Sequence, residues 1–335
     1  MRAYQLKSKG IDGLAEVELP DPKPGPRQIL VKIAACSLNY RDLAVVSGNY
    51  PAPTKADVVP LSDGAGEVVA VGVGVSHFKV GDKVAGNFSQ RWYGGLPAPE
   101  NGNHVLGGPI DGTLCDYIVF EETGAVKLPS HLSLEEGAAL PCAGVTAWHA
   151  IVEHGRVKAG DIVLVQGTGG VSIFALQFAR MLGAEVIATS SSDEKLRHAK
   201  SLGAAHLINY KTTPEWDKKA VELSGGGVDQ VVEVGGAGTV MRSLGAIKSG
   251  GKVSMIGVLT QPSGDFNPMM ILAKRANVQG ISVGSTQMFE AMNRAMAVNG
   301  MKPVIDKVFP FAETKAAFRH LESGKHFGKV VISLA

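Results

Sequence analysis

The sequence predicts a two-domain α/β protein in which a β-rich domain accompanies a doubly wound parallel sheet. Three observations lead to this fold class. The 335 residues exceed one ordinary domain, and 45% of them are hydrophobic, which is enough to build two cores. The second half of the chain alternates short apolar strands with helix patterns, as parallel sheets do. A glycine-rich turn joins the first of these strands to its helix.

The first part of the chain, up to about residue 125, is rich in predicted strands and turns. Turn signals such as Asp21-Pro22 and Gly81-Asp82 separate the strand-like runs. These runs cover residues 29–34, 66–71, 83–85 and 115–120. They predict a compact, partly barrel-like β domain. Residues 90–109 contain mainly Gly, Pro and Asn without periodicity, which predicts a long surface loop that can border a pocket.

From Ser133 onward the pattern favours helices. Ser133 and Glu136 have capping-box spacing, and a second helix is expected over residues 145–154, before Gly155. Six apolar strands with intervening helices then predict the two halves of a doubly wound sheet. The expected strands cover residues 162–165, 185–189, 206–209, 229–234, 252–256 and 278–283. The chain closes with amphipathic helices over 287–299 and 311–323 and a strand over 329–334.

The glycine-rich turn is the most informative motif. Side chains at Gly167, Gly169 and Gly170 would keep the backbone away from a pyrophosphate, whereas the free amides at the start of the following helix attract its charge. Ser172 replaces the third glycine of the usual pattern and still permits close helix packing. An ordinary glycine turn is the alternative, but the strand and helix alternation favours a dinucleotide site. Its predicted cofactor contacts are Gly167, Thr168, Gly169, Gly170 and Val171.

The end of the second strand of the parallel sheet indicates which dinucleotide binds. An acidic residue at this place would hold the ribose hydroxyls of NAD. Here the strand ends in Ser190 and Ser191, while Asp193 and Glu194 belong to the next helix, with Ser191 and Glu194 at capping-box spacing. Small hydroxyls and the nearby Lys195 suit a 2′-phosphate better, so we predict NADP. The alternative is that Lys195 is simply a solvated helix residue.

Several segments of the chain resemble the medium-chain dehydrogenase/reductase superfamily. They are the glycine turn, GDKVAG at 81–86, LPCAGVTAWHA at 140–150, INY at 208–210 and GKVVISL at 328–334. The resemblance covers nearly the whole chain. Within the superfamily, the chain is most similar to the zinc-type alcohol dehydrogenase-like and quinone oxidoreductase-like members. It implies a GroES-like β-rich domain, residues 1–130 and 285–335, joined to a Rossmann NADP-binding domain, residues 131–284.

The resemblance also implies further cofactor contacts. In similar quinone reductases a lysine and a tyrosine bind the 2′-phosphate, which makes Tyr210 a candidate beside Lys195. Thr146 matches a position near the nicotinamide. A strand-end tyrosine and a helix threonine can both be structural instead. The loops after the fourth and fifth strands are expected to contact the ribose and nicotinamide through Val234, Gly235, Gly257, Val258 and Leu259.

The pattern of metal ligands departs from that of the zinc enzymes the chain resembles. They bind catalytic zinc through a Cys, a His followed by Glu, and a second Cys or His, leaving one open position. Here Asn39 stands at the first place and Ser62 and Asp63 at the second, so only Cys142 matches. Cys115 is the sole cysteine between residues 88 and 119, where a four-Cys structural zinc would lie. We therefore expect no metal.

Without a metal, hydrogen-bond donors must stabilise the negative charge that hydride transfer leaves on the acceptor. Tyr50 is similar in position to the tyrosine that acts as the acid in zinc-free enoyl reductases, and a phenol can donate a proton. Asn39 and Tyr40 lie on the same loop and can orient a substrate carbonyl. The alternative for both tyrosines is a packing role.

Together these observations predict a zinc-independent, NADPH-dependent oxidoreductase that reduces a quinone or an α,β-unsaturated carbonyl compound. A metal-free alcohol or aldehyde dehydrogenase and an NADPH-binding redox sensor remain as alternatives. The net charge of +2 and the lack of basic runs argue against nucleic acid, and no run is long enough to span a membrane. Without a signal-peptide pattern, we expect a cytoplasmic protein. Family analogy suggests a homodimer formed near residues 278–283.

Overall fold

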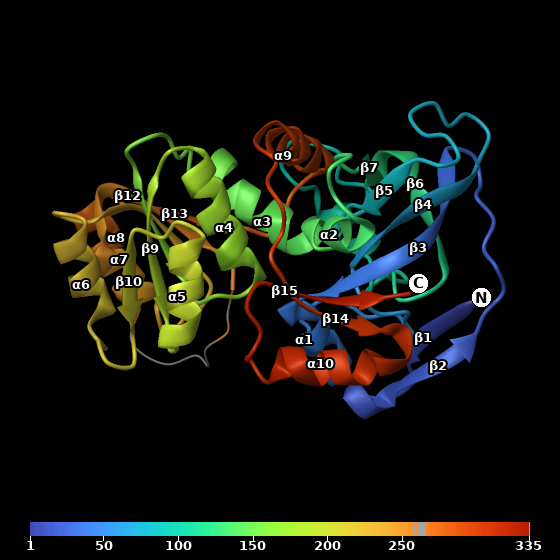
Figure 1. Ribbon diagram of the computed structural model, residues 1–335, viewed down its shortest axis with the longest axis horizontal. Coiled ribbons are helices and arrows are strands. Elements are labelled where there is room, and N and C mark those ends of the chain that lie inside the picture. The colour runs from blue at the N-terminus through green and yellow to red at the C-terminus, as the bar shows by residue number, and fades with distance from the viewer. Residues whose placement is uncertain (258, 260–265, 335) are drawn as a thin grey trace. The chain divides into compact units, whose positions relative to one another are not determined.

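The computed structural model describes residues 1–257, 259 and 266–334, and the chain divides into two compact units (Figure 1). Unit 1 comprises Met1–Val145 and Val283–Ala335, and unit 2 comprises Thr146–Ser282. Residues 131–145, which the sequence pattern places with the second domain, group with unit 1. The reason is that helix α2 (Leu134–Ala138) packs on strands β3 (Gln28–Leu38) and β4 (Asp63–Val71).

Unit 1 is built on a sheet with the strand order β14-β15-β3-β4-β5-β7, and β6 pairs with β3 off this path. The remaining strands are β5 (Lys83–Gly86), β6 (Tyr117–Glu121), β7 (Ala125–Lys127), β14 (Ile305–Pro310) and β15 (Lys329–Ser333). Strands β1 (Arg2–Leu6) and β2 (Leu14–Glu18) form a separate antiparallel pair. The side chains of Ile29, Val31 and Ile33 alternate into the core along β3, as expected for a strand with one buried face.

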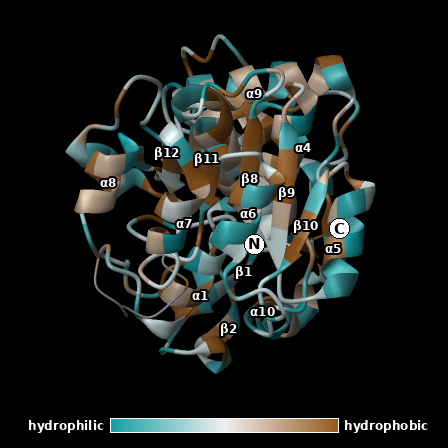
Figure 2. Ribbon diagram, turned by 90° about the vertical axis from the view of Figure 1, so that its left-hand side faces the viewer, coloured by the Kyte–Doolittle hydropathy of each residue, from teal (hydrophilic) through white to brown (hydrophobic). Residues whose placement is uncertain are grey.

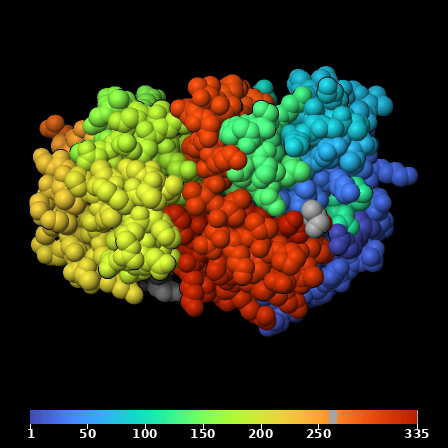
Figure 3. All heavy atoms as spheres, in the orientation of Figure 1, coloured from blue at the N-terminus to red at the C-terminus, as the bar shows by residue number. Residues whose placement is uncertain are grey.

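The C-terminal segment completes this unit. β15 pairs with β14 on one side and, antiparallel, with β3 on the other, with Val330 opposite Leu38. Figure 3 shows C-terminal residues (red) against N-terminal residues (blue) on the surface of unit 1. Residues far apart in sequence therefore form one core.

Short helices connect the strands of unit 1. The capping box predicted at the start of α2 is confirmed, because Ser133 N donates to Glu136 Oε2 (2.8 Å) and Glu136 N donates to Ser133 Oγ (3.1 Å). The predicted loop over 90–109 contains one short 3₁₀ helix, Pro99–His104. The other helices are the 3₁₀ turns Ile11–Gly13, Glu122–Gly124 and Phe311–Glu313, the π-helical Leu140–Gly144, and α1 (Tyr40–Ser47), α9 (Thr286–Asn299) and α10 (Thr314–Glu322).

Unit 2 contains a six-stranded parallel sheet with the order β10-β9-β8-β11-β12-β13. Renumbered from the first strand, this is the 3-2-1-4-5-6 order of a dinucleotide-binding fold, so the predicted fold class is confirmed. The strands are β8 (Ile162–Gln166), β9 (Glu185–Ser190), β10 (His206–Asn209), β11 (Val228–Glu233), β12 (Ile247–Met255) and β13 (Asn277–Gly280). Val163, Leu164 and Val165 are fully buried, and Figure 2 shows β8, β9 and β11 coloured as hydrophobic. Such strands are buried on both faces, which explains their continuous apolar runs.

Helices connect these parallel strands. The helix predicted over 145–154 is α-helical at α3 (Val145–Trp148) and π-helical over His149–His154. The other helices are α4 (Gly170–Met181), α5 (Asp193–Ser201), α6 (Trp216–Leu223), α7 (Val240–Ala246) and α8 (Met269–Lys274). Among the described residues, no helix has the length and apolar character needed to cross a bilayer.

Candidate functional site

The glycine-rich turn lies at the carboxyl end of β8, directly before α4. Gly167 has a φ of +71°, a conformation that glycine adopts without strain, and the space beside its Cα is open. Its N–H donates to the Thr189 carbonyl (2.8 Å), which ties the turn to β9. α4 has 12 residues and begins at Gly170, so its first amides and its dipole face this edge of the sheet. This geometry suits a pyrophosphate.

Ser172 explains how the turn tolerates the loss of the third glycine. Its side chain is buried, and Oγ donates to the Gln166 carbonyl at 2.6 Å. The hydroxyl therefore joins the last residue of β8 to the first turn of α4, and helix and strand stay close. Thr168 is buried in the turn and Val171 is half-buried in the first turn of α4.

A buried carboxylate, which the sequence analysis did not single out, organises the neighbouring loop. Glu233 ends β11 and is fully buried. Its Oε1 accepts from Gly235 N (2.7 Å), Gly236 N (2.9 Å) and Thr239 Oγ1 (2.6 Å), and its Oε2 accepts from Gln166 Nε2 (2.8 Å) and Ser243 Oγ. Gln166 ends β8, so Glu233 links the two strands between which the strand order reverses, where open sheets bind ligands. The sequence did contain a signal for this role, because Glu233 ends an apolar strand directly before a glycine-containing loop.

The predicted ribose and nicotinamide contacts follow β11 and β12. The backbone N–H of Leu259 donates to the Val234 carbonyl (3.4 Å), so the two loops lie together. A Cβ at Gly257 would lie 2.3 Å from the same carbonyl, which explains the glycine. Gly235 is buried, and the Leu259 side chain is 47% exposed. Val258 lies outside the described residues. Thr146 is buried at the start of unit 2.

The predicted 2′-phosphate residues gather around the carboxyl ends of β9 and β10. Ser190 is buried, and its carbonyl accepts from Tyr210 N (3.1 Å), which places the two residues side by side. The expectation that Ser191 caps α5 is wrong. The chain stays extended for one more residue, so Ser192 is the N-cap, and its Oγ accepts from Lys195 N (3.3 Å). Ser191 and Lys195 are half-buried, at the entrance to α5 and in its first turn.

In unit 1, a charged pair connects two of the predicted catalytic residues. Asp42 Oδ2 accepts from Asn39 N (2.7 Å), and Asp42 Oδ1 accepts from Arg41 Nη1 (3.0 Å). The Arg41 guanidinium lies 4.8 Å from the centre of the Tyr50 ring, at cation–π distance. Burial raises the pKa of the Asp42 carboxyl, although Arg41 opposes this change. Asp42 and Arg41 thus link the backbone of Asn39 to the ring of Tyr50, whereas Tyr40 is 57% exposed.

The loop over residues 90–109 is fixed beside Tyr50 by the same guanidinium. Arg41 Nη1 donates to the carbonyls of Leu106 (3.2 Å) and Gly107 (2.9 Å). The guanidinium also lies 5.3 Å from the centre of the Phe88 ring. Arg41 was missed in the sequence, because an arginine in the first turn of a helix gives no sign that it will be buried.

The side chains at the expected zinc-ligand positions do not fit a zinc ion. The oxygen of the Asn39 amide accepts from Lys329 Nζ, which lies 3.8 Å from Asp63 Oδ2. Asp63 Oδ1 accepts from Ser62 Oγ (2.7 Å). Burial raises the pKa of the Cys142 thiol far above its usual value, which disfavours the thiolate that zinc needs. An ammonium group among these oxygens would repel a second cation. Across the described residues, no three His, Cys, Asp or Glu side chains form a metal-binding group.

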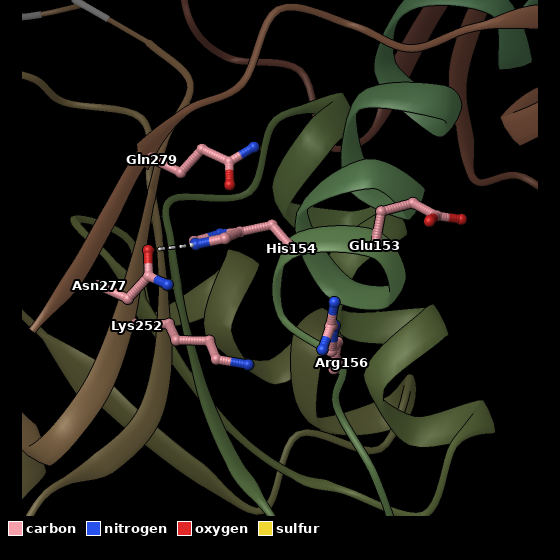
Figure 4. A pocket seen from close by; sticks show the side chains of 6 residues that line it. All are labelled: Glu153, His154, Arg156, Lys252, Asn277 and Gln279. Atoms are coloured by element: carbon pink, nitrogen blue, oxygen red, sulfur yellow. Dashed lines mark hydrogen bonds between the residues drawn. The ribbon is translucent and has the colours of Figure 1, made fainter. Parts of the chain in front are cut away.

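Unit 2 also contains a polar hollow of about 320 Å³ on another part of its sheet (Figure 4). Lys252 in its wall pairs with Gln230, and Gln230 pairs with Val163 near the start of β8. The hollow therefore lies about 10 Å from the carboxyl edge, since each strand residue advances about 3.3 Å. His154 is held there by Ser254 Oγ (2.7 Å) and Asn277 Oδ1 (3.2 Å). This hollow is thus separate from the glycine turn.

Comparisons with known proteins agree with this geometry. The family model described as "Alcohol dehydrogenase GroES-like domain" matches residues 25–130, and the one described as "Zinc-binding dehydrogenase" matches residues 170–297. A zinc-type alcohol dehydrogenase-like protein of Schizosaccharomyces pombe is 46% identical over 95% of this chain and 94% of its own length. A quinone oxidoreductase of Pongo abelii is 28% identical over 96% of this chain and 92% of its own.

Two solved structures are also similar over the whole chain. One, from Sinorhizobium meliloti, is 41% identical with a TM-score of 0.92, and the match covers 99% of this chain and 98% of that one. The other is an NAD-dependent alcohol dehydrogenase, 34% identical with a TM-score of 0.91, and the match covers 100% of both chains.

Proposed function

Because the chain belongs to the medium-chain dehydrogenase/reductase superfamily of oxidoreductases, we propose that it reduces a quinone or an α,β-unsaturated carbonyl compound with NADPH and without a metal. The observation that carries this proposal is the donor set of unit 1. Asn39, Ser62 and Cys142 are a poor set of zinc ligands, and the Lys329 ammonium donates to the Asn39 amide oxygen. A conjugated acceptor is already electrophilic, so hydrogen-bond donors alone can assist its reduction.

Within this proposal, unit 1 supplies the groups that act on the acceptor. Tyr50 donates a hydrogen bond and then a proton from its hydroxyl as negative charge develops on the acceptor. Arg41 stacks against the Tyr50 ring and limits its motion. Asn39 donates from its amide to the acceptor oxygen. Tyr40, which is mostly exposed, has the weakest support among the proposed residues.

Unit 2 binds the cofactor in this proposal, and NADPH, when bound, supplies the hydride. The turn from Gly167 to Val171 holds the pyrophosphate with backbone amides and the N-terminus of α4. The 2′-phosphate is held by Ser190, Ser191, Lys195 and Tyr210. The ribose and nicotinamide lie against Thr146, Val234, Gly235, Gly257, Val258 and Leu259. One solved structure of similar sequence is an NAD-dependent alcohol dehydrogenase, so NAD is the alternative cofactor, and activity with NADPH and with NADH must be compared.

The test is an assay of NADPH and NADH oxidation over a panel of quinones, enones, enals and simple aldehydes, with and without a chelator. We expect NADPH to be consumed with quinones or enones, and the chelator to have no effect. Turnover of simple aldehydes alone would favour the metal-free alcohol or aldehyde dehydrogenase. NADPH binding without turnover of any acceptor would favour a redox sensor. Loss of activity in the chelator would contradict the metal-free mechanism.

A Tyr50→Phe variant tests the proposed proton donor. A positioned acid contributes about 100- to 10,000-fold to a rate, so the variant should lose at least about 10-fold in single-turnover hydride transfer. Tyr117→Phe is the matched control, because Tyr117 lies on β6 and has no role in this proposal. Equal rates for the wild type and Tyr50→Phe would remove Tyr50 from the mechanism.

We also propose that two copies associate through β13. This strand is at one end of the unit 2 sheet, and Asn277 and Gly280 on it are exposed. The free backbone groups of an edge strand can pair with a second copy of the same strand. Sedimentation should show a dimer, and Val278→Pro, which removes a backbone donor, should shift it toward monomer. A monomeric wild-type protein would contradict this.

A further inference from the structure

Lys329 is a buried lysine in unit 1, with 2% of its surface exposed. Lysine is almost never so deeply buried unless it is paired. The antiparallel register that places Val330 opposite Leu38 brings Lys329 next to Asn39. Its Nζ donates to the Leu38 carbonyl (2.8 Å) and to Asn39 Oδ1, and lies 3.8 Å from Asp63 Oδ2. Three oxygens thus surround a group that has three N–H donors.

The Asn39 side chain is not used in the way its position suggests. Asn39 is the N-cap of α1, where an asparagine oxygen usually accepts from a backbone amide of the helix. Here the side chain makes no capping hydrogen bond with the helix. Asp42 helps to cap the helix instead, by accepting from Asn39 N. The Asn39 amide is therefore available for another task.

Lys329 decides which end of that amide is available. An ammonium group has only donors, so the amide oxygen must face Lys329 and the nitrogen must face away. Asn39 Nδ2 is buried and has no hydrogen-bond partner within the described part of the chain. A buried donor without a partner is costly, so its presence at this position points to a group that arrives from outside the protein.

We propose that Lys329 is a positioning residue, whose ammonium orients the Asn39 amide so that Nδ2 is the donor for the oxygen of the acceptor. This inference rests on the proposed function. A cation supplied by the chain stands among the residues at the expected zinc positions.

The proposal makes the effects of two substitutions depend on each other. Asn39→Asp keeps the contact with Lys329 and removes the donor. Lys329→Met keeps the length of the side chain but lets the amide turn its oxygen toward the acceptor. Removing one donor of this kind costs about 100- to 1,000-fold in kcat, which is the loss expected for Asn39→Asp. Lys329→Met leaves an amide that can still turn its NH₂ group toward the acceptor part of the time, so we expect a loss of about 10- to 100-fold. Because both remove the same donor, the double variant should be no slower than Asn39→Asp.

The experiment compares kcat, KM and the Kd for NADPH in these three variants and in Lys329→Arg. Lys307→Met, on an exposed part of the neighbouring β14, is the matched control and should behave like the wild type. Unchanged NADPH affinity is expected throughout, and Lys329→Arg, which keeps the donors, should stay within about threefold of the wild type. Three results would each overturn the proposal. The first is a double variant whose loss in kcat is the product of the two single losses. The others are weaker NADPH binding in Lys329→Met with kcat unchanged, and a kcat of Lys329→Arg as low as that of Asn39→Asp.

A second measurement does not depend on turnover. In ¹⁵N-labelled wild-type protein the two Asn39 side-chain N–H signals, identified by their loss in Asn39→Asp, should be sharp and well separated. They should keep this character in Lys329→Arg and change in Lys329→Met, if that variant folds. If the wild type reduces no acceptor, the proposed function is wrong. The Asn39 signals still test whether Lys329 orients the Asn39 amide. The proposal would be overturned if the Asn39 signals were the same in the wild type and in Lys329→Met. It would also be overturned if the two N–H signals were averaged into one in the wild type and in Lys329→Arg.

Discussion

Replacing Glu233 by glutamine tests whether one buried carboxylate holds the loop after β11 in place. The glutamine has the same shape, and its amide oxygen can keep the three contacts that Oε1 makes with the loop after β11. Its NH₂ group then faces Gln166 Nε2, which is itself a donor. If the amide turns the other way, it loses the three loop contacts instead. Neither orientation satisfies all of the partners.

The size of the effect follows from the number of hydrogen bonds at risk. A hydrogen bond to a charged group contributes about 1.5 to 3 kcal/mol, and at least one such bond is lost, while the others lose their charge assistance. We therefore expect about 3 kcal/mol less resistance to local opening of the loop. Since 1.4 kcal/mol corresponds to a factor of ten, the amides of Gly235 and Gly236 should exchange with solvent about 100-fold faster.

Hydrogen exchange measured by mass spectrometry over residues 228–246 is the assay, with the Kd for NADPH measured in parallel. Affinity should fall, because the loop must be ordered when the cofactor binds. Glu222→Gln is the matched control, since Glu222 lies on α6 and pairs with the exposed Lys219, a contact worth little. If Glu233→Gln exchanges as slowly as the wild type in this segment, the carboxylate does not organise the loop and our reasoning is refuted.

Three further outcomes are expected. Lys195→Ala should weaken NADPH binding about 10- to 100-fold in a fluorescence titration and leave NADH unchanged; an equal loss for both would contradict the 2′-phosphate role. Burial lowers the pKa of His154, so the folded protein binds a proton at this histidine less readily than the unfolded chain does. The contribution of His154 to the free energy of unfolding should therefore be complete above about pH 6.5 and be lost as the pH falls below that value. The His154→Gln variant should show a weaker dependence of the free energy of unfolding on pH in this range. The same slope in both proteins would exclude His154 as its origin. Burial raises the pKa of the Cys36 thiol to about 12, so iodoacetamide should label Cys36 at pH 8 only after unfolding, whereas rapid labelling of the folded protein would show an accessible thiolate.

The sheet of unit 2 could be predicted because its information is local. Continuous apolar runs such as Val163–Val165 and the alternation with helices are visible in any short window. The limits of the elements were harder to predict. β12 begins at Ile247 rather than at 252, because Ile247 pairs with Val228 before a register shift, and pairing resumes only at Lys252 with Gln230. The cap of α5 differs by one serine in a run where each serine is suitable.

The polar residues that organise the candidate site were not predictable in the same way. Glu233 has significance only together with Gln166, which lies 67 positions away in sequence, and with Ser243, which lies 10 positions away on the next helix. Lys329 and Asn39 are 290 positions apart. Neither group leaves a periodic signal, because the contacts depend on how strands from different parts of the chain align. Position in a motif could suggest Asn39 as a candidate, but not which of its two polar atoms is free.

The place of β15 in unit 1 also bears on how the chain is made. During synthesis, unit 2 is complete before β15 leaves the ribosome. Strand β3 therefore lacks its partner β15 until most of these residues have been made. Pairing strands so distant in sequence is slow, and until it happens the edge of β3 beside Leu38 is open to other chains. Synthesis that stops before Lys329 would leave this edge of β3 unpaired and would release the Asn39 amide. Such a product should aggregate even though unit 2 is intact.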